Sequence, residues 1–132
     1  MALMKYREGN QVKWVGVKPA HRGTQIIHSE SIMEDNIDVW TVNDGQIFHL
    51  CTITAGCSRN KDGSGTVVLA NDEGVPQHVL MYIQSYTATP GMFGTVNFWP
   101  PFEIQAGWKI KAYSYAAGLN VECCVFGWEE DE

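Results

Sequence analysis

The chain has 132 residues, of which 45% are hydrophobic and 18% are charged, and this is the size and composition of a single globular domain with its own core. No hydrophobic run approaches the ~20 residues that span a bilayer, and the first residues lack the apolar segment of a secretory signal. We therefore expect a protein that is made in a cytosol and has no membrane partner.

The net charge of −6 is unevenly distributed along the chain. Residues 1–27 contain five basic residues and one acidic residue (+4), whereas residues 28–132 contain four basic and fourteen acidic residues (−10). One interpretation is chance scatter of small numbers. The other is a basic N-terminal arm that docks on an acidic surface, such as the body of a neighbouring copy. Nucleic acid is not expected as a direct partner, because the acidic body would repel phosphate.

The first 36 residues are predicted to form an extended N-terminal arm. Short strands are expected at residues 11–17 and 24–28, with Pro19 and Gly23 interrupting the chain between them. Residues 29–36 are mostly polar and are expected to connect the arm to the body.

The body is predicted to begin at Ile37 with a β-hairpin. Residues 37–42 and 46–54 are strand-like. The turn between them, Asn43-Asp44-Gly45, contains an Asp-Gly pair, which suits turns with positive φ. The pattern therefore predicts that the two runs pair with each other.

Further strand-like runs follow at residues 66–70, 77–85 and 95–99, with polar or Gly/Pro-containing turns between them. The composition of residues 77–85 would also suit a helical turn, but their Val, Tyr and Ile content favours a strand. Pro100 and Pro101 are expected to end the strand at 95–99. A last hairpin, whose turn is at residues 116–120, is expected to close the body.

Seven or eight short strands at near-regular spacing, without helical periodicity, predict an all-β protein. We expect an antiparallel β-sandwich or jelly roll, with a small barrel as the alternative. The predicted organisation is an extended arm, residues 1–36, followed by a β-sandwich (jelly-roll) body, residues 37–132.

The cysteines and histidines do not have the spacing of a metal site. There is no C-x-x-C pair, and Cys123 and Cys124 are adjacent in a predicted strand, so their side chains should point to opposite faces. The four histidines include no H-x-H or H-E-x-x-H pattern. We expect no metal and no cofactor, with the thiols as small apolar fillers; a Cys51–Cys57 or cross-sheet disulfide is the alternative in an oxidising setting.

No catalytic motif is recognisable. A Gly-x-Ser-x-Gly elbow and a Gly-rich phosphate loop are both missing from the sequence. The acidic residues cluster in predicted turns and at residues 129–132, which are expected to be solvated. The sequence therefore predicts no catalytic residues.

Five tryptophans are many for this length, and most are expected to pack in the core or at a sheet rim. Trp14 differs because it lies in the arm, which has no core of its own to bury it. We therefore expect Trp14 to be an anchor on a partner surface, together with the basic residues Lys13, Lys18 and Arg22. Trp99 and Trp108 lie near Pro100-Pro101 and are candidates for a platform that stacks on a ligand.

The body resembles short β-rich virion proteins of tailed bacteriophages, of the capsid decoration or cement type. The resemblance rests on Gln105-Ala106-Gly107-Trp108-Lys109-Ile110, on Val125-Phe126-Gly127-Trp128-Glu129 and on the Gly45-Gln46-Ile47 step, and it covers residues 37–130. It implies a jelly-roll body that assembles as a homotrimer, and an arm that clips to the major capsid protein or to other subunits on the capsid surface of the virion.

Taken together, the residues and the resemblance lead to one expected function and two alternatives. We expect a non-enzymatic capsid decoration protein that binds and stabilises a shell through its arm and body. The first alternative is a carbohydrate- or receptor-binding β-sandwich of a tail or fibre. The second is an enzyme on a jelly-roll scaffold, which would require a pocket that gathers histidines and a carboxylate.

Overall fold

The structure, a computed structural model, describes residues 2–8, 11–17, 23–57, 61–86 and 93–132. These residues form ten β-strands and no helix. It follows that no helix in the described ranges could cross a membrane. The all-β prediction is confirmed.

The first two strands form a hairpin of their own. β1 (Ala2–Glu8) pairs antiparallel with β2 (Gln11–Val17), with Ala2 opposite Val17 and Glu8 opposite Gln11. Both belong to a two-stranded sheet and contribute to neither of the larger sheets. The strand expected at residues 11–17 is therefore present, and it has a partner strand in residues 2–8.

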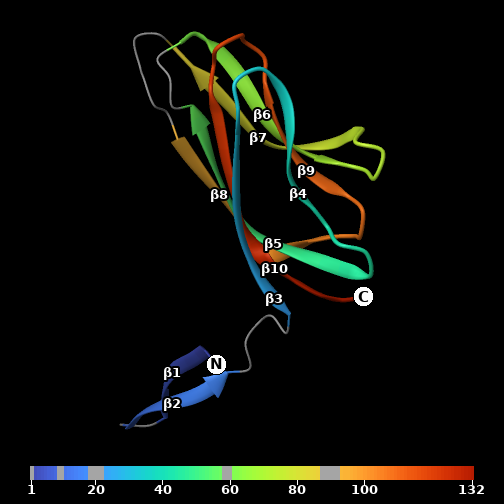
Figure 1. The fold of residues 1–132 in the computed structure, drawn as a ribbon. Helices are drawn as coiled ribbons and strands as arrows, with labels where there is room; N and C mark the ends of the chain where they lie inside the picture. The colour runs from blue at the N-terminus through green and yellow to red at the C-terminus, as the bar shows by residue number, and fades with distance from the viewer. Residues whose placement is uncertain (1, 9–10, 18–22, 58–60, 87–92) are drawn as a thin grey trace.

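The remaining strands form two four-stranded antiparallel sheets that pack face to face (Figure 1). The order in the first sheet is β3 (Thr24–Ile32), β10 (Val121–Asp131), β5 (Gln46–Cys57) and β8 (Phe93–Ile104). The order in the second sheet is β4 (Asp35–Thr41), β9 (Lys109–Ser114), β6 (Gly63–Ala70) and β7 (Pro76–Ser85). Strand pairs β3–β10, β4–β9, β5–β8 and β6–β7 are nested, which is the order of a jelly roll.

Both hairpins predicted in the body are wrong. β4 and β5 lie in different sheets, and so do β9 and β10. The turn at Asp44-Gly45 does form, with Gly45 at a φ of 73°, but it carries the chain from one sheet to the other. A turn signal reports a change of direction and does not say whether the flanking strands pair. Of the consecutive strands that the structure describes in the sandwich, β6 and β7 alone are neighbours in a sheet.

The sandwich begins at Thr24, although the sequence predicts that residues 24–36 belong to the arm. β3 pairs with β10 from Thr24, opposite Glu129, to Ile32, opposite Val121. Side chains along β3 alternate between exposed and half-buried, and Ile26 and Ile32 pack against the core. The polar residues between these two isoleucines conceal this alternation in the sequence.

The core lies between the two sheets and is built from the inward side chains of both. Its largest fully buried members are Phe48, Leu50, Ile53, Ile104, Ile110 and Leu119. Cys57 and Cys123 are buried among them, and all four cysteines are free thiols. Burial, with a smaller contribution from the neighbouring Cys124, raises the pKa of the Cys123 thiol to about 12.

The raised pKa of Cys123 predicts a loss of stability in alkali. An unfolded thiol ionises near its model value of 9.0, whereas the folded Cys123 stays protonated until about pH 12. The stabilisation is complete below pH 9 and is lost as the pH rises towards 12, by about 1.4 kcal/mol per pH unit.

Chemical unfolding between pH 8 and pH 11 should test this prediction, with Cys123→Ala as the comparison. The variant should be less stable at pH 8 because it leaves a small cavity, but its stability should fall less steeply with pH. Parallel pH dependences in the two proteins would contradict the assignment, because the other titrating groups are common to both.

Candidate interaction surfaces

A buried carboxylate, Glu129, connects β10 to the turn between β4 and β5. Its side chain accepts hydrogen bonds from Trp40 Nε1 at 2.9 Å, from Asn43 Nδ2 at 2.7 Å and from the backbone N–H of Asn43 at 3.2 Å. Glu129 is only 5% exposed, so the expectation that residues 129–132 are all solvated is wrong at this position. Three donors satisfy the carboxylate, and this indicates a structural role.

The outer face of the first sheet carries an aromatic and acidic cluster. His49 stacks on Trp128 with ring centroids 4.8 Å apart, and its Nε2–H donates to the Glu130 carboxylate at 2.7 Å. Glu103 lies 3.9 Å from the other ring nitrogen. Nowhere in the described ranges do three or more His, Cys, Asp or Glu side chains gather as metal ligands would. His49 belongs to β5, Trp128 and Glu130 to β10, and Glu103 to β8, so these contacts link three neighbouring strands of the sheet.

Strand β8 does not end at the prolines, contrary to the prediction. Its pairing with β5 runs from Phe93 to Asn97 and resumes at Phe102, so residues 98–101 bulge opposite Cys51. Prolines are tolerated here because β8 is the outermost strand of its sheet and the bulge interrupts the ladder. The bulge projects Trp99 into solvent with 87% of its surface exposed.

The two tryptophans proposed as a stacking platform have different surroundings. Trp99 is exposed at the bulge, whereas Trp108 is half-buried and packs against the core. Trp108 also lines an open groove of about 430 Å³ between β7 and β8, together with His78 and Phe102. Trp99 is therefore the one of the pair with both ring faces accessible, and the structure does not support a platform made of both.

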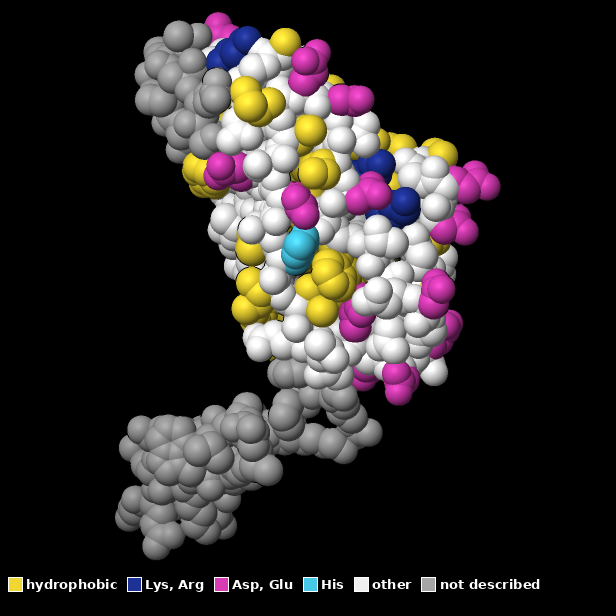
Figure 2. Space-filling model, viewed as in Figure 1, with side chains coloured by type: hydrophobic (Ala, Val, Ile, Leu, Met, Phe, Trp, Pro, Cys, Tyr) yellow, Lys and Arg dark blue, Asp and Glu magenta, His cyan; other side chains and the backbone are white. Residues whose placement is uncertain are grey.

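The side of the sandwich formed by β3 and β4 is acidic. Figure 2 views the molecule from this side and shows Asp and Glu side chains scattered over it. Asp38 in β4 forms ion pairs with Lys111 at 2.9 Å and Lys109 at 3.4 Å. Burial raises the pKa of Asp38, but the hydrogen bonds and charges of these two lysines outweigh it and hold the pKa below its usual value.

An open hollow of about 570 Å³ adds to this acidic surface near the start of β3. Its lining includes the carboxylates of Asp44, Glu129, Glu130 and Asp131. The hollow therefore has the charge that a basic segment would prefer. Gly23, which follows residues 18–22, and Thr24, the first residue of β3, also line the hollow, so it lies where the arm joins the sandwich in the sequence.

The four arm residues predicted as anchors remain predictions. Lys13 and Trp14 lie in β2, opposite Tyr6 and Lys5, and the structure does not describe their side chains. Lys18 and Arg22 lie outside the described residues. Compared with known proteins, the chain matches no protein-family model and has no significant match among curated sequences.

Proposed function

We propose that this chain is a non-enzymatic structural protein of a virus particle, a capsid decoration or cement protein that stabilises the shell. Its partners are other copies of the same chain, as a homotrimer, and the major capsid protein or another virion subunit. It is made in the host cytoplasm and its final place is the capsid surface.

The observation that carries this proposal is the contrast between two parts of the chain. The hairpin of β1 and β2 pairs with neither sandwich sheet, and the segment up to residue 27 carries a net charge of +4. The rest of the chain carries −10. A basic hairpin and an acidic sandwich are complementary between copies, and opposite potentials steer such parts together.

The strand order agrees with the proposal but does not distinguish it from its alternative. Jelly rolls of eight strands in two sheets recur in viral capsid and lectin domains, so the architecture is compatible with both the proposal and its alternative. Architecture alone does not assign a function. The charge contrast is what favours a protein that docks through its arm.

A reconstitution experiment tests the proposal. Capsid shells assembled without this chain are mixed with the full chain or with a full-length variant in which Lys5, Arg7, Lys13, Lys18 and Arg22 are changed to Gln. We expect the full chain to co-sediment with the shells and the variant to bind at least about tenfold more weakly, because it loses the charges that complement an acidic partner. Raising the salt concentration should weaken only the wild-type interaction strongly.

Circular dichroism serves as the control, since both proteins should have the same strand spectrum and unfolding temperature. Failure of the wild-type chain to co-sediment would overturn the proposal, and so would equal binding by the neutralised variant. If the chain instead bound glycans through Trp99, which is 87% exposed, a carbohydrate-binding module of a tail or fibre would be the better assignment.

A further inference from the structure

A stretch of 28 residues, from Val75 to Phe102, contains no Asp, Glu, Lys or Arg. The charged fraction of the whole chain, 18%, would place about five charged residues in a stretch of this length (0.18 × 28). The described part of the stretch, residues 75–86 and 93–102, contains all of β7 and most of β8. We call these described residues the uncharged wall.

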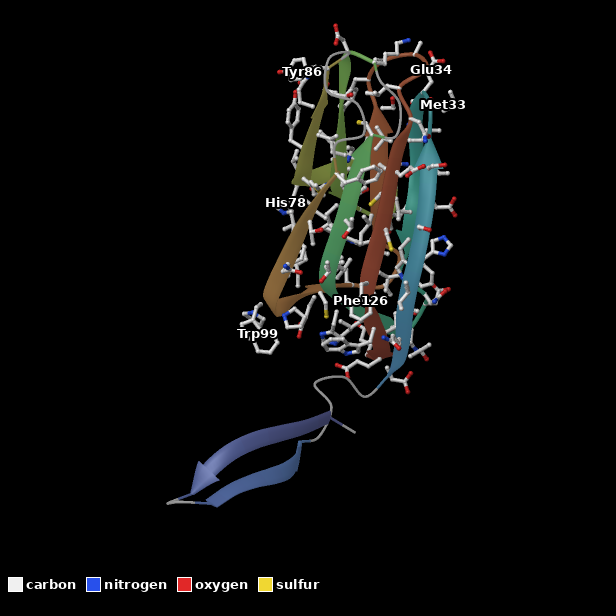
Figure 3. The ribbon with its side chains drawn as sticks, turned by 90° about the vertical axis from the view of Figure 1, so that its left-hand side faces the viewer. Met33, Glu34, His78, Tyr86, Trp99 and Phe126 are labelled. Atoms are coloured by element: carbon white, nitrogen blue, oxygen red, sulfur yellow. The ribbon has the colours of Figure 1, made fainter. Side chains whose placement is uncertain are left out.

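Both strands of the uncharged wall are edge strands, and they lie on the same side of the sandwich. β7 is outermost in the second sheet and β8 is outermost in the first. The methyl carbon of Met81 in β7 lies 2.9 Å from the position that a Cβ on Gly94 in β8 would occupy. Figure 3 shows Tyr86, His78 and Trp99 along this side, with Met33 and Glu34 on the opposite side.

The uncharged wall also concentrates the exposed hydrophobic surface. Of the eleven large hydrophobic side chains that are exposed in the described residues, seven belong to it: Val75, Val79, Tyr82, Tyr86, Phe93, Trp99 and Phe102. Single exposed hydrophobic residues are ordinary, but a group of this size on one side of a molecule marks an interaction surface.

The opposite pair of edge strands differs in charge. β3 contains Glu30, β4 contains Asp35 and Asp38, and Glu34 lies between the two strands. Charged side chains on an edge strand hinder its pairing with another chain. β3 and β4 have this protection, whereas β7 has none.

We propose that the uncharged wall is the surface through which copies of this chain contact one another, facing the rotation axis of a homo-oligomer. Near a rotation axis a residue meets its own counterpart from the next copy, so any charge there opposes a like charge. A surface for a different protein would not be restricted in this way, because the partner could supply opposite charges. The absence of charge from β7, and from β8 as far as Phe102, next to Glu103, therefore favours a second copy as the occupant.

The net charge supports the same occupant. Each copy carries −6 overall, so two copies repel each other over most of their surfaces. The uncharged wall is where they can approach without opposing like charges. The groove between β7 and β8 adjoins this surface, and its lining combines the apolar side chains of Leu69, Phe102, Ile104 and Trp108 with the carboxylates of Glu103 and Glu132, so the uncharged surface ends there.

Val79→Glu tests the inference, with Ile27→Glu as a matched control. The two residues are β-branched, lie on edge strands at opposite sides of the sandwich, and are 66% and 65% exposed. Sedimentation at micromolar concentration should give a multiple of the 14.7 kDa monomer for the wild type and for Ile27→Glu. Val79→Glu should sediment as a monomer, with a dissociation constant raised at least about a hundredfold, because each contact would bury an unpaired charge.

Trp99→Glu is a second variant on the uncharged wall, and its 87% exposure means that the change should not affect folding. A monomeric wild type would overturn the inference and would indicate another occupant, such as a foreign protein or a glycan. Undiminished association of both wall variants would also overturn it, and so would dissociation of Ile27→Glu to the same extent.

This inference rests on the proposed function and names the surface for its self-association, and the two can fail separately. The variant with five arm residues changed to Gln should keep its oligomeric mass but should no longer co-sediment with the capsid shells. Val79→Glu should sediment as a monomer, although its arm has the wild-type sequence. An oligomer that dissociates on Val79→Glu but never binds shells would leave this inference intact and overturn only the decoration function.

Discussion

Gly127→Ala should lower the free energy of unfolding by about 3 kcal/mol or more, because a methyl group at this position has no space. The added Cβ would lie 2.1 Å from the carbonyl oxygen of His49 and 2.9 Å from the ring of Phe48. The carbonyl belongs to the backbone of β5, which pairs with β10 in the interior of the first sheet. Relief therefore requires that two central strands move apart, and a side-chain rotation would not suffice.

Chemical unfolding followed by circular dichroism measures this effect, and Gly45→Ala is the control. Gly45 has a φ of 73° but nothing within 4 Å of an added Cβ, so its replacement should cost only about 1 kcal/mol, from backbone strain. If Gly127→Ala were no more destabilising than Gly45→Ala, the close approach of β10 to β5 at this position would be wrong.

The contrast between these two glycines also shows what the sequence could predict of the fold. Gly45 follows Asp44, and the pair indicates a turn without any knowledge of the rest of the chain. Nothing beside Gly127 in the sequence indicates that its lack of a side chain is needed, because the crowding atoms come from His49 and Phe48. Local signals identify turns, whereas close approaches between distant strands depend on the pairing.

Strand positions were predictable for the same reason. β7 was expected at residues 77–85 and spans Pro76–Ser85, because its composition is that of a strand and turn residues bound it. Strand partners were not predictable, since the turn at Asp44-Gly45 gives the same signal whether its flanking strands pair or cross to the other sheet. The prediction that the prolines end β8 was wrong for a similar reason. Proline interrupts a central strand but is tolerated in an edge strand with a bulge, and the sequence does not show which kind of strand β8 is.

The candidate surfaces could also be predicted only in part, because local sequence signals do not show how the strands pair. The uncharged wall is visible in the sequence as a stretch without charge, and that signal could have found it before the structure. That this stretch forms one surface could not be predicted without the sheet order, because the sheet order makes β7 and β8 edge strands on the same side of the sandwich. The role of Glu129 had no local signal in the sequence, since the three residues that follow it are also acidic and are half-buried or exposed.

Glu129→Ala should lower the free energy of unfolding by about 3 kcal/mol, because it removes the acceptor of three hydrogen bonds at once. Trp40 Nε1 and the two nitrogens of Asn43 would lose their partner, and the turn between β4 and β5 would lose its attachment to β10. Glu129→Gln should cost less, since its amide oxygen still accepts from one or two of these donors while its NH₂ group opposes another.

Glu132→Ala provides the matched comparison, because Glu132 is an exposed carboxylate three residues further along the chain, and its loss should change stability by no more than about 0.5 kcal/mol. Urea unfolding of the wild type and the three variants, monitored by tryptophan fluorescence, gives the ranking directly. Because Trp40 donates to Glu129, its emission should also shift towards that of a more solvated indole in Glu129→Ala under native conditions. Equal stabilities for Glu129→Ala and Glu132→Ala would mean that the carboxylate does not hold this end of the sandwich together.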